Sequence, residues 1–162
     1  MHESVRALAE ALAQEDASAN DLVARLDGRS TDYGSNVVVE EPALDGVARG
    51  NVVRHSPEED RPAHVVLSLR KPLELAPLAK LLGEPARVHP DHPGEPVELV
   101  YQRPFVAGPH PITLIARSEG DATARSVVLR DAGHAPFWDS AAEFNAVVRD
   151  FVREGAGDAS ST

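Results

Sequence analysis

The sequence predicts an α+β fold in which two repeated α-β-β-β units build one antiparallel sheet, with helices on one face and a C-terminal helix. Three observations predict it. Six Val- and Leu-rich runs come in two groups of three, a helical pattern precedes each group, and Pro-, Gly- and Asp-rich turns separate the runs. Sequential strands joined by such short loops are expected to be antiparallel.

The N-terminal region is expected to form two short helices or one kinked helix. Val5, Leu8 and Leu12 recur at helical spacing. Ser18 then begins a capping box with Asp21, and a second apolar face continues as far as Gly28, a natural helix stop.

The first group of strands is predicted at residues 36–41, 49–55 and 64–69. A short helix is expected over residues 72–83, with a proline near its first turn. Residues 84–96 hold four prolines and are predicted to be an extended loop.

The second group of strands is predicted at residues 97–103, 112–118 and 125–131. A final helix is expected over residues 140–153, because Ser140 and Glu143 form a capping box. The residues of its apolar stripe recur at helical spacing and are Phe144, Val147, Val148, Phe151 and Val152. Residues 1–154 are therefore expected to form one domain, and the small, polar residues 155–162 a disordered tail.

An internal repeat is suggested by residues 38–69, which align with residues 100–131 without a gap. Matched positions include Val38/Val100, Pro42/Pro104 and Gly46/Gly108, so turn residues agree as well as strand residues. The repeat units would span residues 18–70 and 73–131. The alternative is two similar hairpins imposed by the same turn chemistry.

This order of elements resembles two families. Tandem α-β-β-β units with the helix end Leu82-Gly83-Glu84-Pro85 resemble the beta-lactamase-inhibitor-protein and outer-membrane-assembly lipoprotein type of module. The small acidic chain with helices flanking groups of strands also resembles type III secretion chaperones. Both resemblances imply a protein-binding role, and neither carries a functional residue onto this chain.

Composition and charge limit the partners. The chain carries a net charge of −10 and has no cysteine, so disulfides and thiolate metal sites are excluded. An acidic surface disfavours nucleic acid and anionic membranes and suits a basic protein or a cation. The N-terminus has no signal-peptide pattern and no apolar run approaches about 20 residues, so a cytoplasmic location is expected. Abundant Ala, Arg, Val and Pro suggests a bacterial gene.

Residues 131–152 resemble the C-terminal end of α/β-hydrolases, in which a strand leads to Gly-His-x-Pro and a helix. The resemblance implies His134 as a general base and Asp121 as its acid. The family also needs a serine in Gly-x-Ser-x-Gly, and this chain has no such motif. The other interpretation is that residues 134–138 end a strand and attach the last helix to the core.

Two further groups of residues are candidate binding sites. His89, Asp91 and His92, with His110 and His134 elsewhere, offer imidazole and carboxylate ligands for zinc, or else belong to a solvated loop. Aromatic residues are scarce, so an exposed one is a candidate contact. The candidates are Phe105, which lies between Pro104 and Val106 and is expected to be exposed, Tyr101 and Trp138.

The sequence is therefore interpreted as a non-catalytic, protein-binding module of a bacterial cytoplasm, like a chaperone, an inhibitor or an immunity protein. No cofactor is expected, and a homodimer through a sheet edge is one possible assembly. Two alternatives remain open. One is a small or degenerate hydrolase-like enzyme that uses His134, and the other is a small-ligand binder with a pocket between helices and sheet.

Overall fold

The computed structural model describes residues 2–120 and 122–131. The predicted final helix (140–153), the tail, Asp121, His134 and Trp138 lie outside the described residues. The described elements follow the order α1 (His2–Leu12), α2 (Ala19–Leu26), β1 (Arg29–Asp32), β2 (Asn36–Glu40), β3 (Val47–Ser56), β4 (Glu59–Glu74), α3 (Ala76–Leu82), β5 (Ala86–Val88), β6 (Glu98–Val100), β7 (Ile112–Glu119) and β8 (Thr123–Asp131).

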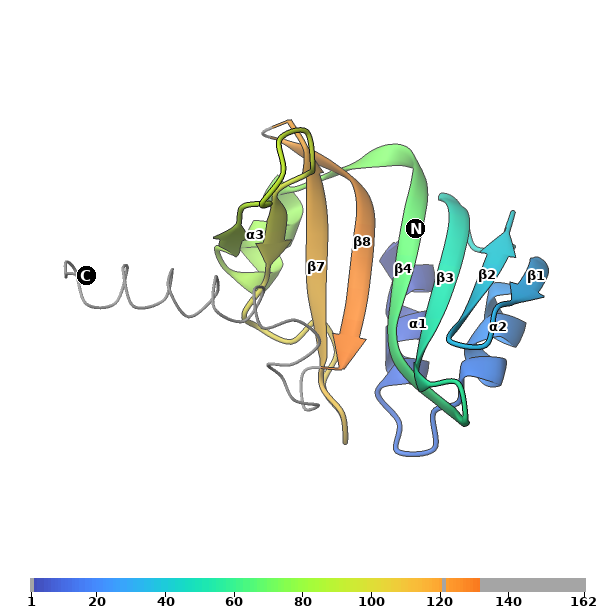
Figure 1. Cartoon of the computed structure of the whole chain (residues 1–162). Coiled ribbons are helices and arrows are strands. Elements are labelled where there is room, and N and C mark those ends of the chain that lie inside the picture. Colours follow the sequence, from blue (N-terminus) through green and yellow to red (C-terminus); the bar gives the residue numbers. More distant parts are fainter. Residues whose placement is uncertain (1, 121, 132–162) are drawn as a thin grey trace.

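All eight described strands join one antiparallel sheet in the order β1-β2-β3-β4-β8-β7-β6-β5 (Figure 1). This confirms the predicted α+β class with an antiparallel sheet. The last strand of each predicted group, β4 and β8, pair with each other at the centre of the sheet. In the described part of the chain, no helix is long and apolar enough to span a membrane.

Two strands were missed by the sequence prediction. β1 has the polar sequence Arg-Ser-Thr-Asp and is exposed along its whole length, so it carries no hydrophobic signal. β5 lies inside residues 84–96, which were predicted to be a loop. Both strands are at the ends of the sheet, where one neighbour is enough to hold a short segment in register.

The long strand β4 extends well beyond the predicted residues 64–69. The predicted strand was too short because β4 contains two prolines, and a proline normally argues against a central strand. Pro62 pairs with Arg54 next to a register shift of the β3–β4 ladder. Pro72 lies within a second shift, between Ser68 and Leu73, after which β4 pairs with β8 again. The following helix, α3, consequently starts at Ala76 rather than at residue 72.

The core lies between the sheet and the helices. Figure 1 shows α1 and α2 behind the sheet. Helix side chains join one face of the strands in a single hydrophobic cluster that includes Val5, Leu8, Leu12, Leu22, Leu26, Leu78, Leu82, Val39, Val52, Val65, Leu67, Leu114, Val127 and Leu129. Gly50 of β3 allows the close approach of α2, since a Cβ there would lie 2.8 Å from Cδ1 of Leu26.

The opposite face of the sheet carries the alternate residues of each strand. A row of directly paired positions crosses six strands on this face. We call it the cross-strand row, and it consists of Val38, Asn51, Val66, Val128, Ile115 and Val100. On either side of the row, arginines pair with carboxylates of neighbouring strands, as in Arg49–Glu40 and Arg117–Glu98.

Candidate functional site

Two of the three predicted contact residues are buried. Phe105 is 4% exposed and Tyr101 is 1% exposed, so the expected exposure of Phe105 is wrong. The segment that carries Phe105 folds back against α1, where Arg6 donates to the Phe105 carbonyl and lies over its ring. The Phe105 amide in turn donates to the Ile112 carbonyl. Burial and these contacts remove the Phe105 ring from any interaction surface.

The predicted metal ligands do not form a cluster. His89, Asp91 and His92 are all exposed in the connection between β5 and β6. Among the residues that the structure describes, no group of three His, Asp or Glu side chains is arranged to hold a metal ion. His110 lies elsewhere, beside Asp131 and Arg61.

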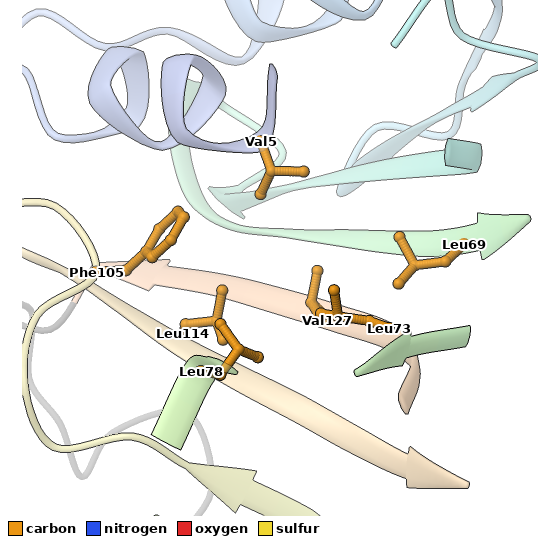
Figure 2. A pocket seen from close by; sticks show the side chains of 7 residues that line it. All are labelled: Val5, Leu69, Leu73, Leu78, Phe105, Leu114 and Val127. Carbon is orange, nitrogen blue, oxygen red and sulfur yellow. The ribbon is translucent and has the colours of Figure 1, made fainter. Parts of the chain in front are cut away.

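A small apolar cavity lies between α1, α3 and the sheet (Figure 2). The side chains that surround it are Val5, Leu69, Leu73, Leu78, Phe105, Leu114 and Val127. Its volume is about 20 Å³, which accommodates about one water-sized sphere. With an entirely apolar lining and this size, it is a packing defect of the core and holds no ligand site.

A larger pocket of about 280 Å³ lies on the other side of α3. We call it the α3 pocket. Helix α3, the segment that leads into β5, the end of β6 and the turn between β7 and β8 contribute to it, with Glu74, Ala79, Glu84, Arg87, Tyr101 and Ser118 among the lining residues. This volume is just below the range of about 300–1,000 Å³ that is usual for small-molecule sites.

Polar groups without partners gather in the α3 pocket. In the described part of the chain, Glu74, Glu84 and Arg87 form no ion pair, and nothing hydrogen-bonds to the Tyr101 hydroxyl. Burial raises the pKa of Tyr101, the negative charge of Glu84 raises it further, and Arg87 opposes them. The phenol is therefore held in its neutral form between charges of opposite sign.

The second candidate surface is the outer edge of β1. This strand pairs only with β2 among the described strands, and all four of its residues are exposed. Tyr33 follows it directly and is 66% exposed, the most exposed large hydrophobic side chain of the described residues. Sequence reasoning missed this surface because the strand itself has no apolar alternation.

Arg54 fixes this edge to the rest of the sheet. Its side chain is 8% exposed, and the guanidinium donates to both carboxylate oxygens of Asp32, at 2.9 and 3.1 Å, and to the carbonyl of Gly34 at 2.8 Å. It also donates to Asp60, whose other oxygen accepts the amide of Asn20 at the start of α2. Arg54 of β3 thus links the end of β1 to β4.

Comparisons with known proteins identify the fold alone. No protein-family model matches the chain, and no curated protein sequence matches it significantly. A solved structure of a DUF4309 family protein (YjgB) from Bacillus subtilis resembles it with a TM-score of 0.52 and 14% identity. The similarity covers 80% of this chain and 97% of that chain. The chain is therefore an α+β protein whose function must be inferred from its own surfaces.

Proposed function

We propose that this chain is a non-catalytic module of a bacterial cytoplasm that binds another protein through the outer edge of β1. The observation that carries the proposal is the exposed edge strand, which ends at the exposed ring of Tyr33. An extended partner segment added there gains main-chain hydrogen bonds, and an exposed aromatic residue beside it offers a side-chain contact.

The hydrogen-bond pattern of the hairpin supports this use of the edge. The Tyr33 amide donates inward to the Asn36 carbonyl. Because inward and outward groups alternate along an antiparallel strand, the amides and carbonyls of Ser30 and Asp32 point outward. The net charge of −10 favours a basic partner. A second copy of the chain, joined edge to edge, is the homodimeric form of the same interaction.

A substitution at Ser30 tests the edge directly. Ser30→Pro removes an outward amide and leaves the ladder to β2 intact, whereas Ser30→Ala keeps the amide and serves as the matched control. Tagged wild-type protein is used to isolate a stoichiometric partner, and each purified variant is then titrated with that partner. We expect Ser30→Pro to weaken binding at least about tenfold and Ser30→Ala to bind as the wild type does. Equal affinity of both variants would exclude the β1 edge.

A second candidate function is the binding of a small molecule in the α3 pocket. It is supported by a buried phenol beside a carboxylate and a guanidinium that have no partners among the described residues. Charges of both signs suit a small zwitterion, with its carboxylate at Arg87 and its ammonium at Glu84. Three probes of one carbon skeleton test this, namely leucine, 3-methylbutylamine and 4-methylpentanoate. Binding of leucine alone, lost in Tyr101→Phe, would favour this candidate.

The hydrolase-like alternative depends on His134 and Asp121, which both lie outside the described residues. An esterase assay of the wild-type protein, with the His134→Ala variant as its control, would test for a hydrolase-like reaction.

We also propose that the chain arose by duplication of an α-β-β-β unit. The alignment equates Val66 with Val128, and these two residues pair directly across the β4–β8 ladder. Their neighbours pair as Val65 with Leu129 and Leu67 with Val127, as a twofold axis between β4 and β8 requires. An experimental structure in which residues 38–69 and 100–131 fail to superpose would refute the duplication.

A further inference from the structure

The cross-strand row, aliphatic at every position except Asn51, forms a strip on the face of the sheet that α1 and α2 leave open (Figure 1). Val128 and Ile115, at its centre, are each 1% exposed. They nevertheless do not belong to the hydrophobic cluster that the described helices join. Helices α1 to α3 therefore do not account for the burial of these two side chains.

The described part of the chain ends beside this strip. β8, which carries Val128, ends at Asp131 in the centre of the sheet, and residues 132–162 follow. An extended segment the length of residues 132–139 reaches at most about 26 Å, more than the about 10 Å from the end of β8 back to Val128. The C-terminal segment is thus tethered within reach of the strip.

The sequence of this segment is complementary to the strip. Residues 140–153 combine a capping box with one stripe of two phenylalanines and three valines. A helix of this length measures about 21 Å, and six neighbouring strands span about 24 Å.

We propose that residues 140–153 form a helix that lies across the cross-strand row of the same chain and covers Val66, Val128 and Ile115. The sheet is then covered on both faces, and its free surface is reduced to its edges. A helix on this face leaves the β1 edge, rather than the open face, for a partner.

The chain has no cysteine, so in a cross-linking test only the introduced cysteines can form a disulfide. Val66→Cys, on the central strand β4, is combined in turn with Val147→Cys, Val148→Cys or Phe151→Cys on the predicted apolar stripe. Ala146→Cys and Arg149→Cys, on the opposite side of the predicted helix, are the matched controls. Under mild oxidation we expect an intrachain disulfide from the stripe positions and none from the controls. Equal cross-linking at all positions, or none at any, would overturn the proposal, and an interchain disulfide would assign the strip to a second copy.

A second measurement does not depend on disulfide geometry. The thiol of Val66→Cys, introduced alone into the otherwise unchanged chain, is labelled with a maleimide. We expect labelling at least about tenfold faster when Phe144→Asp and Phe151→Asp are added, and no change with the control pair Ala146→Asp and Arg149→Asp. Circular dichroism of each variant monitors the fold. Unchanged labelling in a folded Phe144→Asp/Phe151→Asp variant would contradict the proposal.

Discussion

His110 Nδ1 lies 3.4 Å from Oδ2 of Asp131, a carboxylate that is almost completely buried at the end of the central strand β8. On the other side of the ring, Arg61 lies 3.3 Å from Nε2. An arginine only donates, so Nε2 accepts and the ring proton is on Nδ1, directed at Asp131. The His110 amide donates to Ala13 after the end of α1. One residue thus connects a loop, two strands and the N-terminal helix.

His110→Ala is expected to lower the free energy of unfolding by about 1–3 kcal/mol, because it removes the contact between His110 Nδ1 and the buried carboxylate of Asp131. Urea denaturation measures the change. His89→Ala is the control. His89 is exposed, so its replacement should change the free energy of unfolding by no more than about 0.5 kcal/mol. Equal effects of the two substitutions would contradict a structural role for His110.

Arg54→Lys is expected to destabilise the protein by about 1–3 kcal/mol although the positive charge is kept. An ammonium group does not reproduce the planar fork that reaches Asp32, Asp60 and the Gly34 carbonyl together. Arg29→Lys is the matched control, because Arg29 and its partner Glu41 are exposed and such pairs contribute about 0–1 kcal/mol. Chemical denaturation of both variants tests the difference.

The pH dependence of the free energy of unfolding should reveal the contribution of the Arg54–Asp32 ion pair. The hydrogen bond from Arg54, and next that from the Gly34 amide, lower the pKa of Asp32. A lowered pKa in the folded state contributes stability that is present above the ordinary pKa of aspartate and is lost as the pH falls through the folded-state pKa. The stability difference between wild type and Asp32→Asn should therefore be constant near neutral pH and shrink below about pH 4. A difference that persists unchanged down to pH 2.5 would count against this.

The stability lost on replacing Gly50 by alanine should be restored by a substitution of its neighbour, whereas the stability lost on replacing Gly28 should not. Gly50→Ala is expected to cost about 1–3 kcal/mol, because the new methyl group meets the buried side chain of Leu26. In a Leu26→Ala background that cost should largely disappear. Gly28→Ala should not be rescued in the same way, since a Cβ there lies 2.5 Å from the Glu40 carbonyl oxygen, which belongs to the backbone. A double-mutant cycle from thermal or urea unfolding measures both outcomes.

Local patterns in the sequence predicted much of the secondary structure. Ser18 is confirmed as the N-cap of α2 by the hydrogen bond from the Asp21 amide to Ser18 Oγ, and two separate N-terminal helices form, as one of the two alternatives expected. The six strands with apolar residues also appear, with shifted ends. These features are encoded within a few residues, because capping groups and the alternation of apolar side chains depend on near neighbours in the chain.

Only the tertiary structure decided which segments meet. The pairing of β4 with β8, the edge strands β1 and β5, and the burial of Phe105 and Tyr101 all depend on residues far apart in sequence. The same holds for the α3 pocket, where Glu84 and Arg87 meet Tyr101. Hydrophobic periodicity records which face of a segment is buried and carries no information about which distant segment buries it. The pairing of distant segments is decided when all elements pack around one core. This packing determines where both candidate binding surfaces, the β1 edge and the α3 pocket, lie.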